Sequence, residues 1–180
     1  MIEIAQNKLN DLRTFAQNIL VILDGLVKKK DFKILYPFYG NYKITQRFGE
    51  NADIYKPMGY AGHFGIDFAT PFGTKIYACD SGEICRSGFT SGNGNFIEIK
   101  HEWGKSLYMH FKNKPIFKVG DKVDKISILG HAGNTGFVIP TPTKSKPYAG
   151  THLHFSIKLL GVSNPNYKNF IDPHDYLKVR

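Results

Sequence analysis

The stretch Thr151-His152-Leu153-His154-Phe155-Ser156-Ile157 alternates polar and apolar side chains, which is typical of a β-strand with one buried face. The alternation places both imidazoles on one face of the strand. A second stretch, Gly62-His63-Phe64-Gly65-Ile66-Asp67-Phe68-Ala69, holds a histidine and an aspartate four residues apart. In an extended segment this even spacing again puts both groups on one face. The sequence therefore predicts two strands that each present a pair of polar groups.

The sequence from Asp31 onward is typical of a β domain. Short runs of β-branched and aromatic residues are separated by Gly, Pro, Asn and Asp, without a long helical period. We expect Asp121–Asp124 to be a loop between two strands and the Pro-rich Phe137–Gly150 to be a surface loop. The predicted strands are Ile44–Phe48, Phe64–Ala69, Lys75–Cys79, Gly82–Arg86, Phe96–His101, Ser106–Phe111, Lys125–Gly130 and Thr151–Leu159.

The N-terminal part predicts a helix from Ile4 to Val27, followed by Lys28–Lys30 in the last turn, where cations suit the helix dipole. Its apolar stripe either docks on the same chain or pairs with a second copy as a short coiled coil, which would be a helix-mediated self-association. We expect an amphipathic helix over residues 1–30 and one domain over residues 31–180. The stripe consists of Ala5, Leu9, Leu12, Ala16, Ile19, Leu23 and Leu26.

Composition excludes several classes of protein. The chain has 180 residues, of which 42% are hydrophobic and 14% aromatic, so it is unlike a disordered chain and can bury a core. No stretch approaches the roughly 20 apolar residues of a membrane span. The net charge of +9 suggests an acidic partner, such as nucleic acid, an anionic membrane surface or a bacterial wall polymer. The basic residues are spread along the chain, which does not favour nucleic acid.

Two imidazoles and a carboxylate are a suitable ligand set for Zn²⁺ in tetrahedral geometry. Three protein ligands leave the fourth position open for water, which marks a catalytic rather than a structural site. Zinc lowers the pKa of that water to about 7, and a nearby histidine off the metal could take its proton. The helical H-E-x-x-H pattern is absent, which excludes a thermolysin-like arrangement.

From residue 44 to residue 177 the sequence resembles the lysostaphin-like (LytM-type) zinc metallopeptidases, which cleave peptide bonds in bacterial peptidoglycan. The matching motifs occur in the order found in that family. They are Ile44-Thr45-Gln46-Arg47-Phe48-Gly49, Gly62–Ala69, Pro71-Phe72-Gly73-Thr74, the hairpin at Gly82, Tyr108-Met109-His110, Val119–Val123, Gly130, Gly133-Asn134-Thr135-Gly136, Thr151–Phe155, Asp172-Pro173 and Tyr176-Leu177.

The resemblance implies a mainly β fold, a twisted antiparallel sheet whose groove holds one Zn²⁺ at its floor, here preceded by the N-terminal α-helix. It implies that His63, Asp67 and His154 bind the metal, and that His110 and His152 are the catalytic histidines off the metal. We expect His152 to be the general base and His110 to orient the water or stabilise the oxyanion, although the two roles could be shared or exchanged.

Two features depart from the family pattern. The connection Phe137–Gly150 is longer than the family's usual link, so it should rim the groove, where it selects substrate, covers the site or is an inert insertion. The N-terminal helix has no counterpart in the family's minimal catalytic domain.

The other candidates are assigned as follows. We expect the histidines without a matching role to be structural or solvated. Tyr55 and Tyr60 are candidates for binding a peptide or an oxyanion, whereas Tyr108 is expected to pack in the core. Cys79 and Cys85 flank a reversal, and they form either a disulfide or two reduced thiols. The histidines without a role are His101, His131 and His174.

The sequence thus predicts a zinc metalloendopeptidase, a peptidoglycan hydrolase that lyses or remodels the cell wall. The alternative is a non-enzymatic module of the same fold that binds the wall or activates a hydrolase. We expect it to act at the cell wall, in an extracellular, periplasmic or virion-associated setting. The first residues lack a signal-peptide pattern, which suggests a phage endolysin or virion component, or a chain whose signal has been removed.

Overall fold

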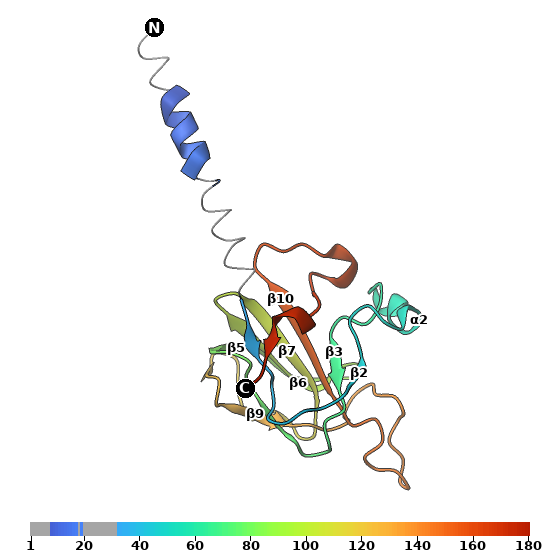
Figure 1. Ribbon diagram of the computed structural model, residues 1–180. Coiled ribbons are helices and arrows are strands. Elements are labelled where there is room, and N and C mark those ends of the chain that lie inside the picture. Colours follow the sequence, from blue (N-terminus) through green and yellow to red (C-terminus); the bar gives the residue numbers. More distant parts are fainter. Residues whose placement is uncertain (1–7, 18, 20–31) are drawn as a thin grey trace. The chain divides into compact units, whose positions relative to one another are not determined.

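The computed structural model describes residues 8–17, 19 and 32–180 (Figure 1). The chain divides into two compact units, residues 1–33 and residues 34–180, which are taken separately. In the first unit residues 8–17 and 19 are helical, and the other parts of the predicted helix, with Lys28–Lys30, lie outside the described residues. No helix in the described part of the chain is long and apolar enough to cross a membrane. Helix-mediated self-association stays a prediction.

The second unit is built on a seven-stranded antiparallel sheet with the strand order β2-β3-β10-β7-β6-β5-β8 (Figure 1). Strand β10 lies between β3 and β7, so the sheet brings segments far apart in the sequence side by side. In this sheet the bounds are β2 Ile44–Gln46, β3 Ile66–Phe68, β5 Gly82–Thr90, β6 Gly94–His101, β7 Gly104–Phe111, β8 Lys122–Val123 and β10 Leu153–Leu159.

Two small ladders and four short helices complete this unit. One ladder is parallel and joins the first and last strands of this unit; the other is antiparallel. The ladders are β1 (Ile34–Leu35) with β11 (Leu177–Lys178) and β4 (Lys75–Tyr77) with β9 (Ile128–His131). The helices are α2 (Ala52–Tyr55) and the 3₁₀ helices η1 (Lys56–Met58), η2 (Pro165–Tyr167) and η3 (His174–Tyr176).

The alternation of β10 divides the sheet into a core face and a groove face. Leu153, Phe155 and Ile157 are fully buried on the core face, as the sequence predicts. The segment after β4 packs on this face, because the backbone N–H of Cys79 donates to the Tyr108 hydroxyl at 2.9 Å. The prediction of a mainly β, antiparallel fold with an N-terminal helix is therefore confirmed, and β10 is the strand that fixes which residues reach the groove.

The structure corrects several predicted boundaries. Lys122–Val123 is a strand, β8, and not a loop, because it pairs with the start of β5 at the sheet edge. The Ile44–Phe48 strand stops at Gln46, where the backbone of Arg47 turns to donate to Glu50. Strand β5 extends beyond its predicted end, and β9 begins at Ile128 and not at Lys125. The short strands β1 and β11 and helix α2 carry too little pattern to be predicted.

The two cysteines are free thiols in the structure. Cys79 is fully buried, and burial raises the pKa of its thiol to about 12. Cys85 is partly exposed, and its thiol donates to the Glu98 carbonyl at 3.4 Å. Of the two alternatives for this pair, the structure therefore has the reduced thiols.

Candidate metal centre

Three side chains from two distant parts of the sequence meet at the floor of the groove. His63 Nε2 lies 3.1 Å from Asp67 Oδ1 and 2.9 Å from His154 Nδ1, and the third edge of the triangle, His154 Nδ1 to Asp67 Oδ1, is 2.9 Å. Asp67 and His154 are paired directly across β3 and β10. All three residues are buried. The structure thus brings together the three residues that the sequence analysis predicted as ligands.

The hydrogen bonds around this triangle show which of its three inward-facing atoms can carry a proton. His63 Nδ1 lies 3.1 Å from the Arg47 carbonyl, which can only accept, so the neutral ring donates from Nδ1 and turns the Nε2 lone pair inward. His154 Nε2 lies 2.6 Å from the Ser156 hydroxyl. At most one proton, on His154 Nδ1, can therefore lie among the three inward-facing atoms. Such a convergence of lone pairs is relieved by a cation.

The size of the triangle fits a small divalent metal. Ligand atoms about 2.0–2.1 Å from a tetrahedral zinc lie about 3.3 Å apart, close to the observed edges. Two imidazole nitrogens and one carboxylate oxygen are also the donor types that zinc accepts. The described residues contain one such cluster of metal-binding side chains, made by His63, Asp67 and His154.

The electrostatics keep this donor set deprotonated. Burial alone would raise the pKa of the Asp67 carboxyl, but the hydrogen bond with His154 outweighs it and holds that pKa well below its usual range. Burial lowers the pKa of His154 to about 4, against an opposing effect of Asp67. The carboxylate is thus charged and His154 neutral at neutral pH, as metal ligands must be.

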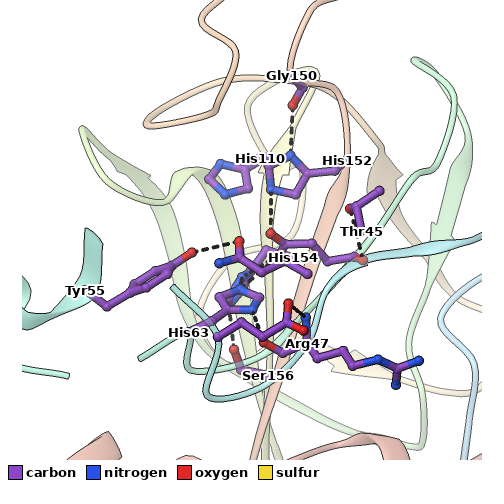
Figure 2. Close-up of polar contacts among 12 residues, drawn as sticks. Thr45, Arg47, Tyr55, His63, His110, Gly150, His152, His154 and Ser156 are labelled. Atoms are coloured by element: carbon purple, nitrogen blue, oxygen red, sulfur yellow. Dashed lines mark hydrogen bonds and ion pairs between the residues drawn. The ribbon is translucent and has the colours of Figure 1, made fainter. Parts of the chain in front are cut away.

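Two further histidines stand beside the triangle, as Figure 2 shows. His152 Nε2 lies 3.7 Å from Asp67 Oδ2, and its ring lies 4.6 Å from the ring of His110, centroid to centroid. Both rings are fixed from behind by backbone carbonyls: Gly150 O lies 2.8 Å from His152 Nδ1, and Thr135 O lies 2.8 Å from His110 Nδ1. Burial, with the neighbouring His152 and His154, lowers the pKa of His110 to about 3.

His110 reaches the groove through an irregular backbone. In a regular strand His110 would point away from Met109, yet both line the groove. His110 has a φ of 63°, in the left-handed region, and the register of β6 against β7 shifts just before it. The strained position turns the imidazole to the same side as Met109.

One glycine makes the close packing around His154 possible. A Cβ at Gly65 would lie 2.5 Å from the Phe155 carbonyl and 2.8 Å from His154 Nε2. Any larger residue would push the chain away from β10 and separate His63 from His154. This is the physical reason for a glycine between His63 and Asp67.

The groove above the triangle has a volume of about 380 Å³. One wall includes Ile54, Tyr55 and Met58, from α2 and η1, and the other includes 137–140 and 150–152. The loop therefore rims the groove, as predicted. Met58, Phe137 and Ile139 are exposed, so the upper walls are apolar.

The three tyrosines named in the sequence analysis lie in different parts of the structure. Tyr55 lines the groove, and its hydroxyl donates to Gln46 Oε1 at 3.1 Å, whereas Tyr60 stacks on Phe64. Tyr108 is buried in the core, as expected. Burial raises the pKa of Tyr55, so its hydroxyl keeps its proton.

The three histidines without a predicted role lie away from the triangle. His101 is buried, stacks on Trp103 and bonds to Ser81 and Ser106, so its role is structural. His131 and His174 are exposed.

Sequence reasoning missed the groups that hold the site from behind. Ser156 continues the alternation of His152 and His154, so the H-x-H-x-S pattern could have identified it. The carbonyls of Arg47, Thr135 and Gly150 carry no sequence signal, because every residue has a carbonyl.

Comparison with known proteins identifies the family to which this chain is similar. Residues 61–169 match peptidase family M23. ShyA of Vibrio cholerae, a peptidoglycan DD-endopeptidase, is 29% identical over 127 residues, which is 70% of this chain and 27% of ShyA. The chain spans about a third or less of the length of the curated relatives it matches.

Solved structures share the fold. The catalytic domain of the antimicrobial peptidase lysostaphin from Staphylococcus simulans superposes with a TM-score of 0.56 at 30% identity, covering 74% of this chain and 90% of that chain. A zinc-containing peptidase from Vibrio cholerae gives a TM-score of 0.58 at 27% identity, over 77% of this chain and 38% of that chain. The span matched by the family, residues 61–169, includes all five histidine and aspartate side chains at the groove. The chain therefore belongs to peptidase family M23, the lysostaphin-like metallopeptidases.

Proposed function

We propose that this protein is a zinc-dependent endopeptidase that hydrolyses peptide bonds in bacterial peptidoglycan, in lysis or remodelling of the cell wall. The observation that carries the proposal is the triangle of His63 Nε2, Asp67 Oδ1 and His154 Nδ1, with His110 and His152 beside it at the floor of an open groove. The family and its peptidoglycan-cleaving member ShyA support the choice of substrate.

His63, Asp67 and His154 would hold one zinc ion through the three atoms of the triangle. When bound there, zinc would supply a Lewis acid for the scissile carbonyl and would lower the pKa of a water molecule. Arg47 and Ser156 fix the two imidazoles from behind, so each ring has one nitrogen free to face the metal.

His152 is the proposed general base. Its Nδ1–H donates to Gly150 O, which leaves the Nε2 lone pair directed toward the Asp67 side of the groove. A lone pair in this place can take a proton from water and return it to the leaving amine.

His110 is proposed to orient the attacking water. Its Nδ1 proton is likewise used, on Thr135 O, so the neutral ring can only accept at Nε2. Of the roles predicted for His110, this favours orienting water over donating to an oxyanion. Tyr55 is the proposed donor to the developing oxyanion, because its protonated hydroxyl lies in the groove wall and can exchange Gln46 for substrate.

The test combines metal content with cleavage. Purified protein would be assayed for zinc, for loss of turbidity of purified peptidoglycan and for released amino groups, alongside His152→Ala and the exposed control His131→Ala. We expect about one equivalent of zinc in all three proteins and new amino termini with the wild type and His131→Ala alone. Walls with glycine bridges and walls with directly cross-linked stems should both be used, since the released fragments name the bond.

Bound zinc without cleavage of any wall would contradict the proposal and support the alternative, a non-enzymatic module that binds the wall or activates a hydrolase. The phage origin and the compartment of action stay predictions from the sequence.

A further inference from the structure

Both proposed catalytic histidines are fixed by the two ends of one loop, residues 136–149. Thr135, just before the loop, accepts from His110 Nδ1 at 2.8 Å, and Gly150, just after it, accepts from His152 Nδ1 at 2.8 Å. A carbonyl only accepts, so each neutral ring must have its proton on Nδ1. The loop ends thereby leave the Nε2 atom of both rings as an acceptor.

The two ends of the loop are tied together by one side chain. The Asn134 amide nitrogen donates to Pro147 O and to Ala149 O, both at 2.9 Å. Both of its N–H groups are thus used on the segment that leads into Gly150. A backbone hydrogen bond from His152 N to Gly133 O, at 3.3 Å, also joins the segments before and after the loop.

The loop between these ends packs on itself. Thr143 and Lys146 exchange backbone hydrogen bonds, and Val138 is almost fully buried. Gly150 has a φ of 68°, and a Cβ on it would lie 2.4 Å from Pro140 O, so the two legs of the loop are in contact. Tyr148 packs on Phe72, outside the loop. This is the compact arrangement of an Ω-loop, which holds its ends in place.

We propose that Asn134 is a positioning residue for the hydrolysis: it holds the Gly150 carbonyl against His152 and so sets the Nδ1–H form of the general base. The inference rests on the proposed function for the role of His152. It assigns the long loop a task that differs from selecting substrate, covering the site or being inert, because the loop anchors the two histidines from behind.

Without the two Asn134 bonds, Pro147 and Ala149 lose their tie to Gly133–Thr135, and only the backbone bond from His152 N to Gly133 O still holds the junction. Gly150 O can then move off His152 Nδ1, and the ring can take the Nε2–H form, which cannot accept a proton from water at Nε2, the nitrogen that faces the groove. His110 keeps its own bond, because Thr135 belongs to the other leg. The effect should therefore appear at His152 and not at His110.

The test is Asn134→Asp, which keeps the shape of the side chain but removes both N–H donors. The matched control is Asn164→Asp, since Asn164 also ties a loop by donating to a backbone carbonyl, that of Phe170 at 2.8 Å, and does not line the groove. Zinc content, kcat and KM on a soluble cross-linked peptide, and the ¹⁵N shifts of the histidine rings would be measured for all three proteins.

We expect Asn134→Asp to lower kcat by about tenfold or more, with KM within about twofold and zinc unchanged, because only the alignment of the base is lost. The ¹⁵N shifts should show His152 with Nδ1 protonated in the wild type and in Asn164→Asp, and a mixture of both forms in Asn134→Asp. His110 should stay Nδ1-protonated throughout.

Wild-type kcat in folded Asn134→Asp would overturn the inference, and so would a wild-type His152 protonated on Nε2, a measurement that does not depend on the variant folding. The proposed function fails separately. If the wild type cleaves no peptide while its His152 ring carries the Nδ1 proton and loses that preference in Asn134→Asp, the positioning by Asn134 stands and the peptidase does not.

Discussion

His63 Nε2 faces Asp67 Oδ1 at 3.1 Å while the opposite nitrogen of the same ring donates to the Arg47 carbonyl. The neutral imidazole therefore turns a lone pair toward a buried carboxylate, an arrangement that is repulsive without a positive charge between the two atoms. The geometry of these side chains therefore fits a cation, and this relationship underlies the predictions for metal binding.

Removing a proposed ligand should abolish both metal binding and activity. His154→Ala leaves two of three ligand atoms, so we expect zinc content to fall from about one equivalent to near zero and turnover to be lost. Metal analysis after dialysis checks the result, with the exposed His131→Ala as control. Full zinc occupancy in His154→Ala would remove His154 from the ligand set.

Removing the proposed base should separate metal binding from chemistry. His152→Ala keeps all three atoms of the triangle, so we expect zinc to stay bound while kcat falls by about 10²- to 10⁴-fold, the usual contribution of a general base. Steady-state rates on a soluble peptide and metal analysis of the same sample test this. If kcat falls less than a few fold, the proton is taken by another group, with His110 the first candidate.

Metal removal should lower stability as well as activity. Zinc that binds only the folded chain adds about 4 kcal/mol to the free energy of unfolding at a free concentration 1,000 times its Kd. We therefore expect chelation to lower the melting temperature of the wild type and re-addition of zinc to restore it. The matched control is Asp67→Asn, whose melting temperature should respond weakly to either treatment. An equal response in both proteins would place the zinc elsewhere.

The metal-free protein should lose stability as the pH falls from about 6.5 to about 4. The pKa of His154 is about 4 in the folded chain, lowered by burial, against about 6.5 when unfolded, so in this range the unfolded state binds a proton that the folded state does not. This difference amounts to about 3 kcal/mol at pH 4 relative to pH 7. The low pKa of Asp67 has the same sign, but its effect begins only below the unfolded value near 3.8.

Denaturant unfolding of the metal-free protein across this pH range measures the effect. His110 has a pKa lowered to about 3 and adds a loss of the same sign. His110→Asn should therefore show a shallower fall in stability than the wild type, whereas His174→Asn, at an exposed histidine, should follow the wild type. A flat profile in the wild type would mean that His110 and His154 are not buried in the metal-free chain.

The sequence by itself determined the strand that carries the site. Alternation over 151–157 placed His152 and His154 opposite Leu153, Phe155 and Ile157, because a two-residue period is a local property of extended backbone. Motif order identified the family and the five side chains at the groove. The N-terminal helix also follows from local periodicity, and its described part is helical.

Only the tertiary structure decided how those side chains meet and what holds them. The pairing of Asp67 with His154 joins residues far apart in the chain, and the left-handed backbone at His110 breaks the local alternation so that its imidazole reaches the groove. The carbonyls that fix His63, His110 and His152 are invisible in a sequence, since all residues share them. The alternation of residues in the sequence shows which face of a strand a side chain lies on. Contacts between residues far apart in the chain decide which other groups that side chain meets.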